Sequence, residues 1–256
     1  MKNINPYFLL AFAAILAFSS CSKDKDITPD PPTKNILLSC SSSGTSVNRC
    51  NRDNTGRLLS YIQSEGTTAK DSLAFTYDAI GNVSMMRWLI YSASAKNEYT
   101  YDSKGKLITR LGYSMNGNLA GTTNFTYFED RMEELRTYSD NSINKYVYFY
   151  TPDKKNIAEF KLYRTSGKVA EESTYTYSNV KAPRIGYEQL SGYTNLNLAE
   201  KTVTTTYNNS VPNSTPVTVT YTSKIIANAD GYPTSVEYSA SNSTVTSTTV
   251  YEYIIK

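Results

Sequence analysis

Apolar and polar residues alternate along most of this chain with a period of two. The alternation is clearest in short aromatic runs at residues 75–77 (FTY), 99–101 (YTY), 146–150 (YVYFY), 175–177 (YTY) and 250–253 (VYEY). A period of two places successive side chains on opposite faces of a strand. Tyrosine, threonine and valine suit such a pleated, half-buried surface. The pattern therefore predicts an all-β protein.

The tyrosine-terminated runs recur at a nearly constant interval. Tyr77, Tyr101, Tyr127, Tyr150 and Tyr177 are separated by 24, 26, 23 and 27 residues. A period in this range indicates repeated supersecondary units that stack on their neighbours. We expect one β-repeat domain over residues 36–256, with regular repeats over about 50–180 and an irregular β region over 181–256.

An Asp followed three residues later by Gly punctuates three of the units. The pairs are Asp53 and Gly56, Asp78 and Gly81, and Asp102 and Gly105. Asp accepts hydrogen bonds from backbone N–H groups further along the turn, and Gly reaches positive φ at little cost. This spacing fits a hairpin turn, so all six residues are interpreted as structural. The expected fold is an antiparallel β-meander of repeated hairpins in a curved or coiled sheet. That sheet is expected to be partly two-layered, because residues 83–91 are apolar on both faces.

The first twenty-one residues follow a different pattern. Lys2 precedes an apolar run over residues 7–18, and Ser19 and Ser20 then precede Cys21. Residues 1–20 resemble the signal peptide of bacterial lipoproteins, and the resemblance implies that Cys21 carries palmitate-type acyl chains. Several acyl chains on one protein anchor it stably in a membrane. An ordinary secretory signal cut near Ser20 is the alternative.

Residues 21–35 are interpreted as the acylated cysteine and a tether. Pro29, Pro31 and Pro32 keep this Pro/Asp/Lys-rich segment extended. Its early acidic residues resemble the surface-export signal of Bacteroidetes lipoproteins, although interleaved lysines depart from that signal. We expect an outer-membrane lipoprotein, on either the periplasmic or the cell-surface face.

The repeat units carry a second resemblance. The runs YTYDSKGKL and FTYDAIGNV are similar to YD repeats, the hairpin units of Rhs-type shell proteins. Together with the lipoprotein signal, they resemble a family of Bacteroidetes lipoproteins with degenerate YD-like repeats and unassigned function. That resemblance implies a β-meander and a non-enzymatic role, and it supplies no catalytic residues.

The amino-acid composition limits the kinds of catalysis, metal site and partner that this sequence supports. The sequence has no histidine, which removes the Ser-His-Asp and Cys-His mechanisms and most transition-metal sites. Beyond Lys2 the chain carries 25 basic and 23 acidic residues, a balance that does not favour nucleic acid. No cofactor and no metal are expected. Cys40 and Cys50 are candidates for a disulfide in an oxidising compartment, and two buried thiols are the alternative.

Three further features of the sequence are candidate functional sites, and two of them also have a structural explanation. Trp88 is a candidate platform for stacking on a ligand, although its neighbours Met85 and Met86 favour a core role. Ser72 lies in a short Asp-Ser-Leu sequence that resembles an O-glycosylation acceptor of Bacteroidetes. The acidic cluster, which alternates with Arg131 and Arg136, is interpreted as a solvated, charge-paired turn rather than a catalytic pair. Its members are Glu129, Asp130, Glu133 and Glu134.

These observations favour a non-catalytic surface lipoprotein that binds a glycan, a peptide or a partner protein. The tyrosines are interpreted as cross-strand ladders whose hydroxyls reach water. A structural or assembly subunit of an envelope complex is the alternative function. A glycan hydrolase is the third candidate. It requires two carboxylates that face each other in a cleft, and the sequence alone does not show such a pair.

Replacing Cys21 with Ala tests the predicted anchor. Without the lipid-bearing thiol the protein should leave the membrane fraction and become soluble, because the remaining sequence supplies only a tether. Fractionation of cells expressing each form measures this, and unchanged membrane retention would falsify the lipoprotein interpretation.

Overall fold

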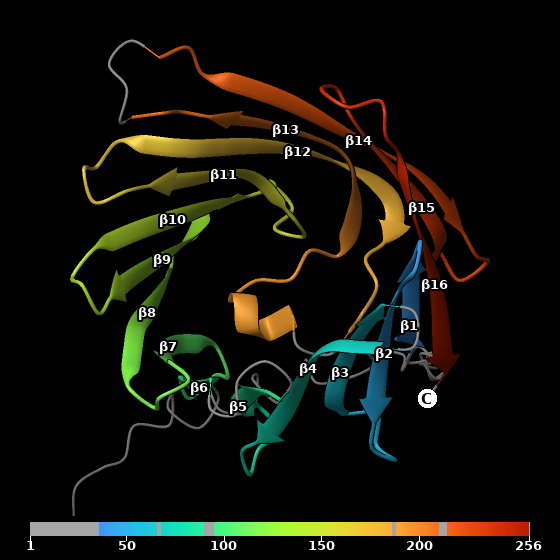
Figure 1. Ribbon diagram of the computed structural model, residues 1–256, viewed down its shortest axis with the longest axis horizontal. Helices are drawn as coiled ribbons and strands as arrows, with labels where there is room; N and C mark the ends of the chain where they lie inside the picture. Colours follow the sequence, from blue (N-terminus) through green and yellow to red (C-terminus); the bar gives the residue numbers. More distant parts are fainter. Residues whose placement is uncertain (1–35, 66–67, 90–94, 186–187, 210–213, 256) are drawn as a thin grey trace, which may run out of the picture. The chain divides into compact units, whose positions relative to one another are not determined.

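The computed structural model describes residues 36–65, 68–89, 95–185, 188–209 and 214–255. They form sixteen strands and one short 3-10 helix (Figure 1). The strands are β1 (Ile36–Ser43), β2 (Ser46–Arg52), β3 (Leu58–Glu65), β4 (Thr68–Tyr77), β5 (Val83–Trp88), β6 (Lys96–Tyr101), β7 (Leu107–Tyr113), β8 (Leu119–Tyr127), β9 (Arg131–Tyr138), β10 (Ile143–Tyr150), β11 (Ile157–Tyr163), β12 (Val169–Lys181), β13 (Asn197–Thr206), β14 (Val217–Ala227), β15 (Pro233–Ala240) and β16 (Ser247–Ile255). The helix η1 (Glu188–Ser191) lies between β12 and β13.

The strands form a closed barrel. Each strand pairs antiparallel with its sequence neighbours, and β1 pairs with β16 from Ile36–Ile255 to Ser42–Val250. The all-β prediction is confirmed, but the open, partly two-layered sheet is wrong. Closure gives every strand two hydrogen-bonded neighbours and so removes the two exposed edges of an open meander.

The Asp–Gly turns lie together at one end of the barrel, which we call the turn end. Gly56, Gly81 and Gly105 have φ angles of 90°, 93° and 76°. Asp78 shows the bonding: its Oδ1 accepts hydrogen bonds from the backbone N of Ile80 at 3.0 Å and of Asn82 at 2.8 Å. The positive φ requires Gly at these corners, and the carboxylate satisfies backbone donors that the ladder leaves unpaired.

The repeated tyrosines hold consecutive turns together. Four of the five repeated tyrosines, and Tyr253 of the last strand, donate the hydroxyl to the carbonyl of a residue near the start of the preceding strand, and we call these bonds the tyrosine staples. They run from Tyr77 to Leu58 (2.7 Å), Tyr101 to Val83 (2.8 Å), Tyr127 to Leu107 (3.0 Å), Tyr177 to Ile157 (2.7 Å) and Tyr253 to Pro233 (2.8 Å). Burial raises the pKa of Tyr127 to about 12, so its hydroxyl keeps the proton that it donates. The expectation that these hydroxyls reach water is therefore corrected.

The turn end is filled from within. Leu58, Val83 and Leu107 belong to one buried apolar cluster with Met132 and Ile157. Residues 182–185 and 188–196, between β12 and β13, enter this space, and Figure 1 shows η1 inside the ring of strands. We call these residues the inner segment, and their Leu190 joins the same cluster. Apolar side chains of the wall and of the inner segment thus pack together at this end, beside a pocket of about 510 Å³ that Tyr193 of this segment also lines.

Specific contacts fix the inner segment. Gly192 has a φ of 76°, and a Cβ there would come within 2.6 Å of the Met132 sulfur. The Tyr193 ring lies 4.7 Å from that of Tyr148. Arg52 Nη2 donates to the carbonyls of Leu38 at 3.0 Å and Ile185 at 2.5 Å. The bond to Ile185 ties the segment to the barrel wall.

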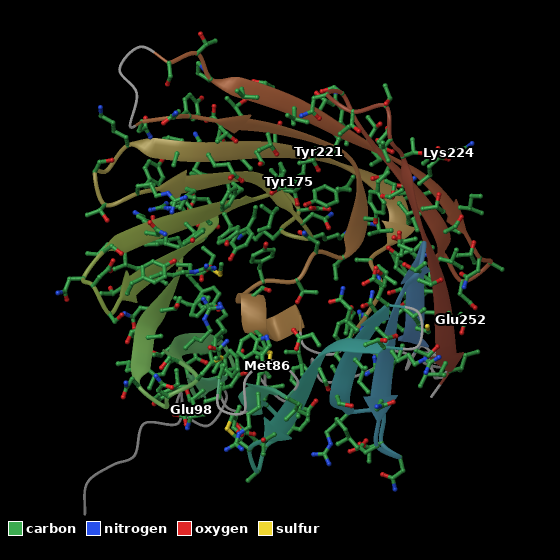
Figure 2. The ribbon with its side chains drawn as sticks, viewed as in Figure 1. Met86, Glu98, Tyr175, Tyr221, Lys224 and Glu252 are labelled. Atoms are coloured by element: carbon green, nitrogen blue, oxygen red, sulfur yellow. The ribbon has the colours of Figure 1, made fainter. Side chains whose placement is uncertain are left out.

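The outer face of the barrel is rich in charged and hydroxyl side chains. The strand register places neighbours such as Met86 inside and Met85 outside, and Figure 2 shows Tyr175 on the inner side and Glu98 and Glu252 on the outer side. Ion pairs bridge outward positions, namely Lys96–Glu98, Arg131–Glu133, Lys145–Glu133 and Lys161–Glu159. Among the residues that the structure describes, no helix is long and apolar enough to cross a membrane.

Replacing Tyr101 with Phe tests the staples. The change leaves the buried Val83 carbonyl without its donor, so the free energy of unfolding should fall by about 1–2 kcal/mol. Urea denaturation measures the loss. Tyr221→Phe is the matched control, because Tyr221 is 45% exposed and its replacement should change stability by less than about 0.5 kcal/mol. Equal effects would contradict a role for the staple.

Candidate binding site

A polar pocket lies inside the barrel toward the end opposite the turns, which we call the mouth. Its volume is about 320 Å³, and Asn97, Arg110, Thr123, Arg136 and Tyr138 are among its lining residues. Two glycines open it: Gly112 on β7 faces Gly121 on β8 in the register. A Cβ on Gly121 would lie 2.8 Å from the Thr137 carbonyl oxygen, so the close approach of β8 and β9 requires glycine there.

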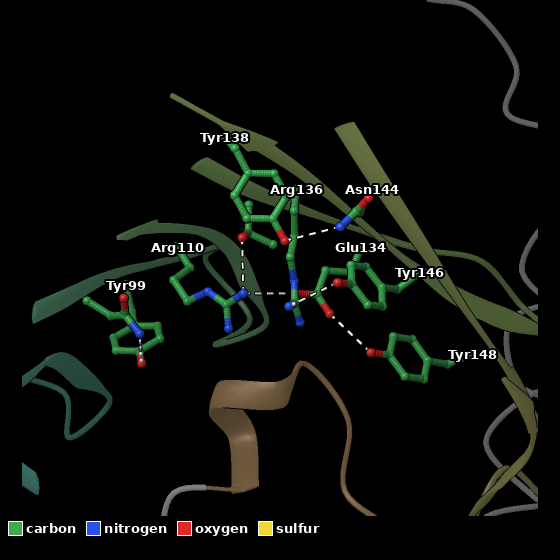
Figure 3. A network of polar contacts seen from close by, with 10 residues as sticks. Tyr99, Arg110, Glu134, Arg136, Tyr138, Asn144, Tyr146 and Tyr148 are labelled. Atoms are coloured by element: carbon green, nitrogen blue, oxygen red, sulfur yellow. Dashed lines mark hydrogen bonds and ion pairs between the residues drawn. The ribbon is translucent and has the colours of Figure 1, made fainter. Parts of the chain in front are cut away.

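A buried carboxylate lies beneath two arginines that line this pocket, and we call these three residues the floor (Figure 3). Glu134 on β9 is 2% exposed. Its Oε1 accepts hydrogen bonds from Arg110 Nη2 at 3.0 Å and from Arg136 Nε at 2.5 Å, and its Oε2 accepts one from the Tyr148 hydroxyl at 3.2 Å. The network joins three strands, β7, β9 and β10, across the inner face of the barrel.

The floor carries a net positive charge. Two guanidinium groups meet one carboxylate, which leaves one positive charge in excess. Burial acts to lower the pKa of Arg136, but the hydrogen bond and charge of Glu134 outweigh it and raise that pKa. Burial, reinforced by the charge of Glu134, raises the pKa of Tyr148. Arg136 therefore stays charged and Tyr148 stays a neutral donor over the physiological range.

Hydroxyl and amide groups continue the pocket toward the mouth. Arg110 Nη2 also donates to Thr123 Oγ1 at 3.1 Å, and Arg136 Nη1 donates to the Tyr146 hydroxyl at 3.3 Å. The Asn144 side chain meets the Tyr138 hydroxyl at 3.2 Å. Tyr138 also lines an adjoining pocket of about 530 Å³. The two pockets together form what we call the mouth chamber.

The structure divides the acidic cluster that the sequence grouped together. Glu134 points inward into the arginine network, whereas Glu133 points outward and pairs with Arg131 and Lys145. Glu129 and Asp130 lie exposed at the turn end. The solvated-turn interpretation is therefore wrong for Glu134, because alternation along β9 places adjacent residues on opposite faces.

The remaining sequence candidates lie outside this chamber. Trp88 ends β5 and packs, partly exposed, against the buried apolar cluster. Ser72 on β4 is only 8% exposed, so the folded protein largely covers the hydroxyl that a glycan would need. Cys21, the signal peptide and the tether fall outside the described residues.

The disulfide hypothesis is corrected. Cys40 and Cys50, both within the described residues, are not joined to each other. Cys40 on β1 opposes Arg49 on β2, so Cys40 and Cys50 point to opposite faces of the wall. Burial raises the pKa of the Cys40 thiol.

Within the described residues, no group of three His, Cys, Asp or Glu side chains is placed to hold a metal ion.

Sequence reasoning missed the residues that form the chamber. Arg110, Gly112 and Gly121 lie in β7 and β8 with no local feature that distinguishes them, and Arg136 lies in strand β9 rather than in the expected charge-paired turn. The useful signal is the position of these residues: Arg110 pairs with the buried Tyr99, and Gly112 pairs with Asn97 on the same face. A charged residue and a glycine on an otherwise apolar face indicate an internal polar space.

Comparison with known proteins bears on the fold. No family model and no curated protein matches the sequence. A porin-like protein from Bacteroides uniformis is similar in structure, with a TM-score of 0.53, 16% identity, and coverage of 86% of this chain and 95% of that one. A porin-like protein from Bacteroides vulgatus gives 0.45 and 11%, covering 85% and 99%. A Tc holotoxin pore of Photorhabdus luminescens gives 0.32 and 14%, covering 76% of this chain and 13% of that one. The first of these likenesses establishes a shared barrel fold.

Replacing Glu134 with Gln tests the floor. The change leaves two arginines without their counter-charge, so the free energy of unfolding should fall by about 2–3 kcal/mol. This loss is somewhat smaller than for a fully buried pair, because Arg110 and Arg136 are 22% and 30% exposed. Thermal or urea denaturation measures it. Glu133→Gln on the outer face should cost less than about 1 kcal/mol. If the two variants lose the same stability, the inner network is not a major contributor.

Proposed function

We propose that this protein is a lipid-anchored, non-catalytic envelope protein that binds a small polar ligand in the mouth chamber. The single observation that carries the proposal is the chamber itself. Paired glycines open it, charged and hydroxyl groups line it, and a buried apolar cluster lies toward the turn end. Concave sites with a few convergent polar groups are the usual form of ligand pockets, and about 320 Å³ lies within their range of about 300–1,000 Å³.

The charges on the outer face support the proposal that water, rather than lipid, surrounds the barrel. A membrane-spanning barrel turns an apolar band outward. Here the outward positions on β6, β9, β10 and β11 carry paired charges such as Lys96–Glu98 and Lys161–Glu159. Attachment would then depend on acylated Cys21 and the tether, which agrees with the resemblance to Bacteroidetes lipoproteins. The outer membrane is the proposed location.

The interior supports binding rather than conduction. The Bacteroides uniformis neighbour is described as porin-like, and its likeness to this chain concerns the fold. In this chain, Leu190 of the inner segment packs into the buried cluster, and the Tyr193 ring packs at a tilt against that of Tyr148. A lumen filled in this way favours a cup closed at the turn end.

The same geometry supports a non-catalytic role. Glycoside cleavage needs two carboxylates about 5–10 Å apart, one of them acting as an acid. Glu134, the buried carboxylate of the chamber, is bonded to Arg110 and Arg136 and so serves to order them. Its position is that of an anchor for the arginines.

One observation favours an assembly role as the second candidate. Apolar side chains project at the turn end, where Ile80 is 80% exposed and Ile226 is 58% exposed, and Phe128 is exposed as well. Exposed apolar groups at one end of a barrel suit packing against a partner protein. Recovery of the protein in a stable envelope complex, lost when Ile80 and Phe128 are replaced by Ser, would favour this candidate.

Screening the purified protein against soluble glycans and peptides tests the binding proposal. We expect saturable binding that Gly112→Val abolishes, because the added side chain fills the chamber beside Asn97. Thr109→Val, on the outer face of the same strand, is the control and should bind normally. Binding that survives in the Gly112 variant would move the site elsewhere, and absence of binding across the screen would overturn the proposal.

A further inference from the structure

The mouth chamber has an excess of positive charge that the protein does not neutralise. Its charged side chains are Arg110, Arg136 and Arg164 against Glu134 and Asp140. Asp140 is engaged within its own turn, where Oδ1 accepts hydrogen bonds from the backbone N of Ser142 at 2.9 Å and from its hydroxyl at 2.6 Å. One positive charge in a partly enclosed space attracts a single anionic group, because charges interact more strongly there than in water.

The arginines also retain donors. Within the described residues, Arg110 uses Nη2 for Glu134 and Thr123, while its Nε and Nη1 make no hydrogen bond to the protein. Arg136 uses Nε and Nη1, which leaves Nη2. Glu134 fixes both guanidinium groups in place before a ligand arrives. Donors that are ordered in advance bind an oxyanion at a lower entropic cost than mobile ones.

The rest of the lining suits a ligand rich in hydroxyl groups. Asn97 donates to the Tyr99 hydroxyl at 3.4 Å, and its Oδ1 borders the open space beside Gly112. Thr123 and Tyr138 add hydroxyls, and Tyr138, 37% exposed, presents a ring at the junction of the two pockets. An aromatic ring beside amides and hydroxyls matches the alternating apolar and polar faces of a sugar.

We propose that the mouth chamber binds sugars that carry a carboxylate, with Arg110 and Arg136 donating to that carboxylate and Asn97, Thr123 and Tyr138 contacting the ring hydroxyls. This inference rests on the proposed function and adds the class of ligand. Arg110 and Arg136 are binding residues, and Glu134 is a positioning residue that acts through them. Monosaccharides with a uronic acid group are the simplest members of the class.

Calorimetric titration of the full chain, in a non-glycosidic detergent, with three matched sugars tests the inference. The sugars are galacturonate, its uncharged methyl ester and galactose. They share a ring size and differ in the group at one carbon, which is charged in galacturonate alone. Galacturonate should bind at least about tenfold more tightly than the other two, and added salt should weaken it, because one charge-assisted contact is worth about that factor.

Arg110→Gln locates the interaction. It should reduce the affinity for galacturonate about tenfold and leave that for galactose nearly unchanged, whereas Arg131→Gln on the outer face should change neither. The comparison of galacturonate with its ester needs only the unaltered protein, so it stands even if the Arg110 variant fails to fold.

The outcomes separate the two proposals. Equal binding of galacturonate and its ester would overturn the carboxylate inference while the proposed function stood. Binding of none of the three sugars would also overturn the inference, and the proposed function would then depend on the wider screen. A preference for the acid that Arg110→Gln leaves intact would overturn the assignment to this chamber.

Discussion

A tyrosine hydroxyl bonded to a backbone carbonyl about twenty residues earlier is the interaction on which this barrel depends. Tyr101 and Val83 show why: the bond fixes the last residue of one strand against the first residue of the strand beside it. Repetition of that bond aligns successive turns at one end and keeps their apolar residues buried together. The inner segment then packs against these apolar residues, and the polar chamber lies toward the opposite end.

The mouth chamber depends on a second, electrostatic constraint. A carboxylate as buried as that of Glu134 is stable only when cations and hydrogen-bond donors compensate its desolvation. Arg110, Arg136 and Tyr148 do so from three strands, and the same contacts hold the arginines against the wall. In this part of the barrel, the same contacts therefore stabilise the wall and hold the arginines in place.

The sequence predicted what local chemistry determines and missed what depends on distant pairing. Alternation located the strands, and the Asp–Gly spacing located turns such as Asp78–Gly81, because both signals lie within a few residues. Closure depends on β1 meeting β16, and no local pattern encodes that contact. Glu133 and Glu134 looked alike because their difference lies in which face β9 turns inward. The chamber was missed for the same reason, since Gly112 and Gly121 meet only through the register.

An even number of strands has a consequence for how the ring is made. The first strand begins and the last strand ends at the turn end, and Ile36 pairs with Ile255 across almost the entire described sequence. Until β16 is in place, β1 and the most recently formed strand present unpaired edges. A chain translocated from its N-terminus would therefore expose both edges until nearly its last residues emerged. Aggregation during folding, rather than loss of stability once folded, is then the main vulnerability of this architecture.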